Sequence, residues 1–153
     1  MTNDITITPA SPRDLTRILA LIRDLSAFHG DEAQVTLEQL QQIFFGPKAQ
    51  GVAFLAREGA EIVGYAGVVE SVVVHSGKPR FDIQHLQIVE NRRNRGIGKA
   101  LIMAARDYAT ARGAKGISIG TDPRNATAQA AYRAMGLEEI TDMGPRFWIA
   151  AAD

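Results

Sequence analysis

Apolar residues recur every second position in some stretches of the chain and every third or fourth position in others. Alternation over residues 5–8 predicts a short strand. Ser11 and Pro12 suit a helix start, because serine caps free N–H groups and proline fits the first turn. Apolar residues then follow at helical spacing until Gly30, and a second, shorter helix is expected over 36–45.

The middle of the chain is rich in residues that favour β-structure. Strands are expected over 52–56, 62–74 and 81–89, with turns between them at 58–61 and 76–79. Turns this short join antiparallel neighbours, whereas parallel neighbours need a crossover of about a dozen residues or more. The pattern therefore predicts an antiparallel meander rather than a βαβ unit.

Helices and strands alternate in the last third of the chain. The expected elements are, in order, a helix from Gly96 to about Gly113, a strand over 116–121, a helix over 125–135 ended by Gly136, and final strands over 138–141 and 146–150. The sequence contains no internal repeat, linker or low-complexity segment. We therefore expect a single mixed α/β domain that spans residues 1–153.

Composition narrows the possible functions. Hydrophobic residues make up 46% of the chain, which favours a packed domain. Lysine plus arginine and aspartate plus glutamate number 17 each, so no global field attracts nucleic acid or a membrane. Cysteine is absent, and the three histidines lack metal-ligand spacing, so no metal is expected. The polar N-terminus and the lack of a long apolar run predict a cytoplasmic protein.

The basic segment 93–98, with the sequence RNRGIG, joins the last strand of the meander to a helix. The start of a helix offers free N–H groups and a partial positive charge. Glycine allows a ligand to approach the backbone closely. These are the requirements of a phosphate site, so the segment is a candidate pyrophosphate-binding turn.

Two common phosphate motifs do not fit this turn. A P-loop needs serine or threonine after Gly98-Lys99, where the chain has Ala100. A dinucleotide fingerprint needs a third glycine where Leu101 stands. A glycine-rich helix start with solvated arginines remains an alternative. It is disfavoured because each glycine in a helix costs about 1 kcal/mol relative to alanine.

The turn also matches a family signature. Arg93, Gly96 and Gly98 fit the Q/R-x-x-G-x-G/A signature of the GNAT acetyltransferase superfamily, and residues 125–137 resemble its N-x-x-A-x-x-x-Y-x-x-x-G-F block. The likeness covers nearly the whole chain. It implies a mixed, mostly antiparallel sheet flanked by helices on both faces.

Within the superfamily, the chain most resembles the spermidine/spermine and thialysine acetyltransferases. The similar stretches are residues 21–25, 32–35 and 77–79. This resemblance implies a small-molecule amine as acceptor and a homodimer as the assembly. In the family, the loop after the first helix often shapes access of the acceptor. The candidate residues in this loop are Phe28, His29, Asp31 and Glu32.

The resemblance also implies acetyl-CoA as co-substrate. The residues expected to bind it are Leu86, Ile88, Arg93, Asn94, Arg95, Gly96, Ile97, Gly98, Lys99 and Asn125. The Leu86 N–H would hydrogen-bond the thioester carbonyl and its developing oxyanion. Tyr132 would act as general acid and protonate the departing thiolate, although among apolar neighbours it could instead be a core residue.

The sequence does not decide which group deprotonates the amine. A lysine-like amine has a pKa of about 10.4, so its neutral form costs roughly 4–5 kcal/mol at pH 7. Polyamine-type enzymes carry a glutamate where this chain has Gln84, which cannot take a proton. Asp82 shares a face with Gln84 in a regular strand, His85 reaches that face only through a bulge, and Glu70 is a third candidate base.

The predicted function is N-acetyl transfer from acetyl-CoA to the primary amine of a diamine, a polyamine or an amino-acid-like molecule, by direct attack. Two alternatives remain: an acetyltransferase for peptides or proteins, and a catalytically impaired module that binds coenzyme A. The second alternative is retained because Gln84, which cannot take a proton, stands where polyamine-type enzymes carry a glutamate. Phe147 and Trp148 are expected to lie in the core or in a dimer contact.

Overall fold

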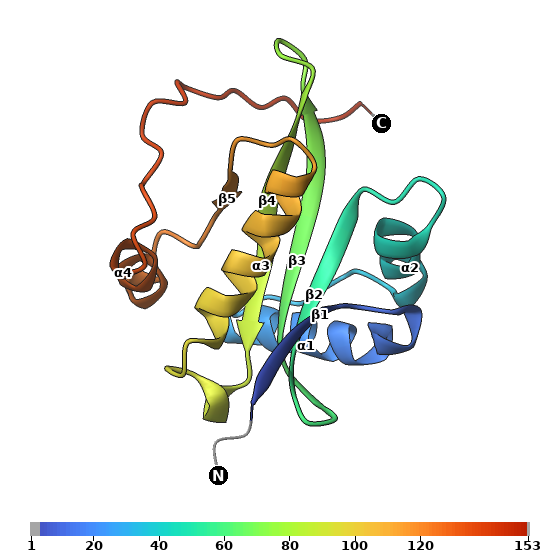
Figure 1. Cartoon of the computed structure of the whole chain (residues 1–153). Coiled ribbons are helices and arrows are strands. Elements are labelled where there is room, and N and C mark those ends of the chain that lie inside the picture. Colours follow the sequence, from blue (N-terminus) through green and yellow to red (C-terminus); the bar gives the residue numbers. More distant parts are fainter. Residues whose placement is uncertain (1–3, 153) are drawn as a thin grey trace. The chain divides into compact units, whose positions relative to one another are not determined.

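The computed structural model describes residues 4–152. The chain divides into two compact units, Met1–Gly120 and Thr121–Asp153, and each is described by itself. Within the described residues, the first unit holds a five-stranded sheet with three α-helices, and the second holds one α-helix (Figure 1). The sheet is mixed and mostly antiparallel, as the sequence predicted.

Strands and helices fall close to their expected ranges up to residue 135. The strands are β1 (Ile5–Pro9), β2 (Gly51–Glu58), β3 (Glu61–Val73), β4 (Lys78–Ile88) and β5 (Ile117–Ile119), in that spatial order. The helices are α1 (Leu15–Phe28), α2 (Leu37–Phe45), α3 (Ile97–Ala111) and α4 (Ala126–Ala134), with 3₁₀ turns η1 (Pro12–Asp14) and η2 (Glu90–Arg92). Among the strand pairs of residues 4–152, only β4 and β5 run parallel, and α3 lies between them in the chain.

Helices α1 and α3 lie on opposite faces of the sheet (Figure 1). Leu55 and Tyr65 are cross-strand partners in β2 and β3 and belong to the core that α1 covers. Phe54 adjoins Leu55, so it points to the other face, where its ring packs edge-on against Tyr108 of α3. Phe81 of β4 packs against the same tyrosine.

Strand β4 carries a bulge at the position where the sequence analysis allowed for one. Ile83 lies opposite Val68 and His85 lies opposite Gly67, so Gln84 is an extra residue with no partner of its own. A one-residue insertion changes which face the following side chains occupy. The bulge therefore decides the orientation of every β4 residue after it.

The prediction of two final strands is wrong. Residues 138–141 and 146–150 form neither helix nor strand, and Phe147, Trp148 and Ile149 are about 90% exposed at 93%, 88% and 89%. Apolar and β-branched residues favour strands only when a neighbouring strand accepts their backbone hydrogen bonds. A sequence pattern indicates that a segment favours a strand, but it does not specify which strand will pair with it. Residues 138–141 and 146–150 pair with no neighbouring strand.

Asp14 should be a major source of stability in the first unit. It is buried, and its Oδ2 accepts hydrogen bonds from the Ser11 N–H (2.8 Å), the Ser11 hydroxyl (3.1 Å) and Arg57 Nη2 (3.0 Å). Burial alone would raise the pKa of Asp14, but the hydrogen bonds from Ser11 and Arg57 outweigh burial and lower it. The carboxylate therefore stabilises the fold above pH 4 or so, and loses this effect as the pH falls through its lowered pKa.

Asp14→Asn is expected to lower the free energy of unfolding by about 3 kcal/mol at pH 7, because it leaves Arg57 without its buried partner. Urea unfolding at pH 7 and at pH 3 measures this. The gap between wild type and variant should shrink at the lower pH. Asp107→Asn is the control, since Asp107 is exposed beside Arg106 and should change little. An equal loss at both pH values would contradict the role of the charge.

Candidate active site

One edge of β4 is open next to the basic turn. Strand β5 pairs with β4 only along Phe81–Ile83. From His85 to Ile88, no other strand of the described residues 4–152 pairs with β4 on the side away from β3. The two parallel strands therefore leave a stretch of β4 backbone available for a ligand.

The backbone of Leu86 and Ile88 faces this open edge. The Val89 N–H donates to the Val63 carbonyl over 3.0 Å, which makes these two residues a hydrogen-bonded pair of the β3–β4 ladder. Bonded and non-bonded pairs alternate in antiparallel strands, so the N–H and C=O groups of Ile88 and Leu86 point away from β3. Arg93 Nε donates to the Ile88 carbonyl over 3.1 Å, in agreement with this direction.

The turn after β4 presents a row of free N–H groups. Asn94 and Gly96 adopt left-handed backbone conformations (φ 62° and 78°), and α3 begins at Ile97. Within residues 4–152, none of the N–H groups of residues 94–99 donates a hydrogen bond to a protein acceptor. Free N–H groups at a helix start, with left-handed residues beside them, form a concave seat for an anion.

Carboxylates of β2 and β3 hold part of the positive charge around this turn. Arg92 forms an ion pair with Glu58, whose side chain is 9% exposed, and a longer one, at 3.6 Å, with Glu61. Arg95 Nη1 lies 4.0 Å from Glu58, but more than half of the Arg95 side chain is exposed, and Lys99 is also exposed. Arg95 and Lys99 are therefore the flanking cations best able to reach an anion. Sequence reasoning missed Glu58, because nothing local marks its pairing with a residue 34 positions away.

Three of the sequence-predicted binding features come together in the first unit. A side-chain Cβ built on Gly98 would lie 3.9 Å from Leu86 Cδ2, so the start of α3 and the open edge of β4 are neighbours. The guanidinium carbon of Arg93 lies 5.9 Å from the centre of the Phe28 ring. Phe28 was expected in the loop but is the last residue of α1, so this contact places the end of α1, where the predicted acceptor loop begins, beside the turn.

The bulge brings two of the candidate bases to one face. Asp82 pairs with Val69 and His85 with Gly67, and directly paired residues point to the same side of a sheet. This is the face that α1 covers. Glu70 pairs with Phe81, which packs on α3, so Glu70 lies on the opposite face.

The candidate bases differ in their surroundings. Asp82 Oδ1 accepts a hydrogen bond from Ser118 Oγ over 2.7 Å. The Gln84 side chain is exposed. His85 is half-buried, and burial lowers its pKa, so its imidazole is neutral at neutral pH and can accept a proton. Among these side chains, His85 therefore has the protonation state that a base requires.

The second unit carries the remaining predicted residues. Asn125 caps α4, since its Oδ1 accepts the Ala128 N–H over 3.0 Å. Tyr132 is half-buried in α4, and burial raises its pKa, so its hydroxyl remains protonated at neutral pH. Gly136, predicted to end this helix, has a left-handed conformation (φ 86°) and follows the C-cap residue, Met135.

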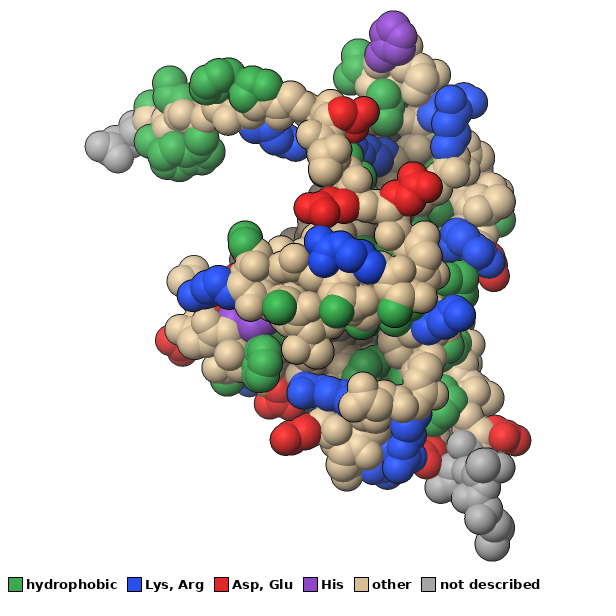
Figure 2. All heavy atoms as spheres, turned by 90° about the vertical axis from the view of Figure 1, so that its left-hand side faces the viewer, with side chains coloured by type: hydrophobic (Ala, Val, Ile, Leu, Met, Phe, Trp, Pro, Cys, Tyr) green, Lys and Arg blue, Asp and Glu red, His purple; other side chains and the backbone are tan. Residues whose placement is uncertain are grey.

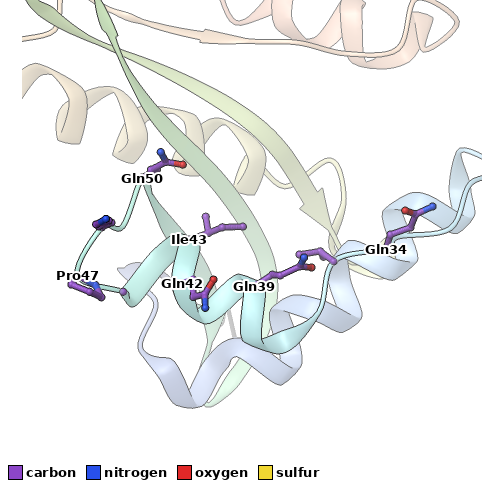
Figure 3. Close-up of a pocket in the computed structure, with 9 residues that line it drawn as sticks. Gln34, Gln39, Gln42, Ile43, Pro47 and Gln50 are labelled. Atoms are coloured by element: carbon purple, nitrogen blue, oxygen red, sulfur yellow. The ribbon is translucent and has the colours of Figure 1, made fainter. Parts of the chain in front are cut away.

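A separate surface pocket of about 830 Å³ runs along α2 (Figure 3). Its lining includes the amides of Gln34, Gln42 and Gln50 beside the apolar side chain of Ile43. It contains none of the β4 or turn residues named above. Its one ionisable lining residue, Lys48, is a cation, which does not suit an amine substrate that is itself cationic. The pocket is therefore distinct from the candidate active site.

No helix of the described residues 4–152 has the length and apolar character needed to cross a membrane. No group of three or more histidine, aspartate or glutamate side chains in this range is placed to hold a metal ion.

Comparison with known proteins relates the chain to one family. A family model described as the acetyltransferase (GNAT) family matches residues 18–137. A Bacillus subtilis (strain 168) protein, named as the uncharacterized N-acetyltransferase YhfO, is 32% identical over 92 residues. The match covers 60% of this chain and spans 62% of the length of that relative.

Solved structures share the fold over nearly their whole length. An aminoglycoside acetyltransferase, meta-AAC0020 from an uncultured soil metagenomic sample, in complex with sisomicin, has a TM-score of 0.78 at 24% identity and 97% coverage of both chains. The aminoglycoside N-acetyltransferase AAC(6')-Iy, in complex with CoA, has a TM-score of 0.79 at 18% identity, with 99% and 98% coverage. At these identities, the likeness establishes the fold alone.

Proposed function

The chain belongs to the acetyltransferase (GNAT) family, and we propose that it transfers an acetyl group from acetyl-CoA to a primary amine of a small molecule. The observation that carries this proposal is the open edge of β4, which leads directly to the free N–H groups of residues 94–99. An edge of outward-facing peptide groups suits the amides of a pantetheine arm, and the row of N–H groups suits a pyrophosphate.

Acetyl-CoA, when bound, supplies an activated thioester carbonyl that an amine can attack. The N–H groups of residues 94–99 would hold the pyrophosphate, assisted by Arg95 and Lys99. The outward-facing groups of Leu86 and Ile88 would align the pantetheine arm along β4. The Leu86 N–H would donate to the carbonyl oxygen as negative charge develops there, a contribution of about 3 kcal/mol for one well-placed donor.

His85 is the proposed base for the acceptor amine. It is neutral at neutral pH because burial lowers its pKa, and it lies on the α1-covered face beside the bulge. Asp82 accepts a hydrogen bond from Ser118, and the exposed Gln84 can orient a water but cannot take a proton. Tyr132 is the proposed acid for the thiolate, and Asn125, at the start of α4, is proposed to contact the co-substrate.

The acceptor class is tested by measuring thiol release from acetyl-CoA with a panel of amines. The panel contains diamines and polyamines, aminoglycosides, free amino acids and short peptides. Turnover on small-molecule amines supports the proposal, and a preference for polyamines would support the spermidine/spermine type. Turnover on peptides alone would replace it with a protein acetyltransferase. Binding of acetyl-CoA without turnover on any amine would replace it with a binding module.

Gly98→Val is expected to weaken acetyl-CoA binding at least about ten-fold with little loss of stability. A Cβ at Gly98 meets only Leu86 Cδ2, at 3.9 Å, so the protein itself has room for the new side chain. The valine would instead fill the space above the free N–H groups, at a cost of more than about 1.4 kcal/mol in binding. Calorimetry measures the affinity. Gly116→Val, at another open position, is the control and should bind normally.

We also propose a homodimer in which residues 147–149 contribute to the interface. Figure 2 shows apolar side chains gathered along the C-terminal segment, where Phe147, Trp148 and Ile149 are about 90% exposed at 93%, 88% and 89%. Single chains rarely expose a contiguous apolar patch of this kind without a partner.

Light scattering should give a mass of twice 16.6 kDa for the wild type. Trp148→Ser should shift the mass toward one chain. Val74→Ser is the control, since Val74 is 95% exposed at the tip of the β3–β4 hairpin and should leave the mass unchanged. A monomeric wild type would refute the dimer.

A further inference from the structure

The phenol of Tyr65 occupies the space that a side chain at Gly67 would need. Tyr65 lies in β3 and is 1% exposed. A Cβ built on Gly67 would lie 2.3 Å from the Tyr65 hydroxyl oxygen and 3.0 Å from Cζ. Real Cβ atoms do not approach other atoms this closely, so the hydroxyl can occupy this position only because residue 67 is glycine.

This position lies directly across the sheet from His85. Gly67 and His85 are partners in the β3–β4 register, and the Cβ positions of such partners are about 4.5–5.5 Å apart. The hydroxyl at the Gly67 position is therefore within a few ångströms of the His85 side chain. The ring centres of Tyr65 and His85 are 6.3 Å apart and their planes are tilted by 57°.

His85 has little else to set its orientation. Within residues 4–152, its imidazole makes no hydrogen bond to another protein group. Its one ring contact in this range is with Tyr65. A base must point steadily at its proton to work efficiently, because small misplacements lower the rate steeply. The Tyr65 ring, which contacts the imidazole, can limit its rotation in this way.

We propose that Tyr65 is a positioning residue for His85, with its hydroxyl seated at Gly67 and its ring limiting the rotation of the imidazole. This inference rests on the proposed role of His85 as base. Gly67 acts indirectly, because its missing side chain creates the seat. The bulge at Gln84 completes the arrangement, because it places His85 opposite this seat rather than on the α3 side of the sheet.

Few ionisable groups face this part of the sheet. Asp82 shares the face on β4, and Tyr65 faces it from β3. Burial raises the pKa of Tyr65 above its ordinary range, so it stays protonated. The α1 residues buried on this face are leucines and isoleucines. Burial is accordingly the cause of the lowered pKa of His85. Loss of the hydroxyl would admit water and move that pKa upward, toward its ordinary value.

The first test is a double-mutant cycle on the pair. Gly67→Ala brings a methyl group into the hydroxyl, so kcat should fall about ten-fold or more, while the acetyl-CoA Kd should stay unchanged. Adding Tyr65→Phe removes the nearest clashing atom, the hydroxyl oxygen, and should raise kcat back toward that of Tyr65→Phe alone, although Cζ at 3.0 Å still crowds the methyl group. Gly116→Ala, at an open position with ordinary backbone angles, is the matched control. A double variant no better than Gly67→Ala would overturn the proposal.

The second test does not depend on turnover. NMR titration of the imidazole signals gives the pKa of His85, and His85→Gln identifies which signal is lost. In Tyr65→Phe, the pKa of His85 should rise. An unchanged His85 titration in folded Tyr65→Phe would overturn the inference. Absence of acetyl transfer in the wild type would instead refute the proposed function and would leave this titration interpretable.

Discussion

Replacing Tyr132 by phenylalanine should lower kcat by about a hundred-fold or more and leave the acetyl-CoA Kd nearly unchanged. The hydroxyl is proposed to protonate the departing thiolate, which matters in the transition state and not in the bound ground state. Burial raises the pKa of Tyr132, so the proton to be donated is present throughout the neutral range. Steady-state kinetics and calorimetry on the same preparation separate the two effects.

Tyr108→Phe is a matched control for this substitution. Tyr108 lies in α3, and its ring packs edge-on against Phe54 and Phe81. These contacts involve the ring, so removal of the hydroxyl should leave kcat within a few-fold of the wild type. If Tyr132→Phe retains the turnover of this control, Tyr132 is a packing residue and the thiolate leaves without its help.

His85→Gln should abolish the acid limb of the kcat/KM profile and lower the rate by about a hundred-fold at its optimum. A base works only when it is unprotonated. Because burial lowers the pKa of His85, the wild-type rate should be maintained as the pH falls to about 6.5 and should decline only below it. In the variant, this decline should disappear, since glutamine does not titrate in this range.

Two further variants make the assignment specific. His75→Gln removes a histidine from the β3–β4 hairpin and should leave the profile unchanged. Asp82→Asn removes the carboxylate that shares the face of His85, and it should keep the acid limb. If Asp82→Asn removes the limb and His85→Gln preserves it, the carboxylate is the base. If both variants preserve it, the proton leaves through water or Glu70.

Local patterns were sufficient to predict most of the elements. A helix start at Thr36 and a stop at Gly46-Pro47 predicted a helix over 36–45, and α2 spans Leu37–Phe45. A long run of β-favouring residues between two turns predicted 62–74, and β3 spans Glu61–Val73. These signals depend on a residue and its near neighbours, because the repeat of a helix or strand is a property of the backbone itself. The same patterns failed at 138–141 and 146–150, where a strand would need a partner that sequence spacing does not specify.

The candidate site also contains some features that the sequence could predict and others that only the structure revealed. The turn at 93–98 was visible in the sequence, because glycines at a helix start are a local signal for a close backbone approach. The outward direction of the Leu86 and Ile88 backbone was visible only by resemblance to the family, and the β3–β4 hydrogen bonding now supports it with a physical reason. The partnership of Arg92 with Glu58 had no signal in the sequence.

By itself, the sequence determined the order of elements up to residue 135, the position of the glycine-containing basic turn at 93–98, and the residue types available for acid and base chemistry. Tertiary structure alone decided that His85 shares a face with Asp82, that Glu70 does not, and that Tyr65 reaches the space left by Gly67. The physical reason lies in the register of β3 against β4. One unpaired residue, Gln84, reverses the side on which the following residues lie, and only the opposing strand determines where that residue falls.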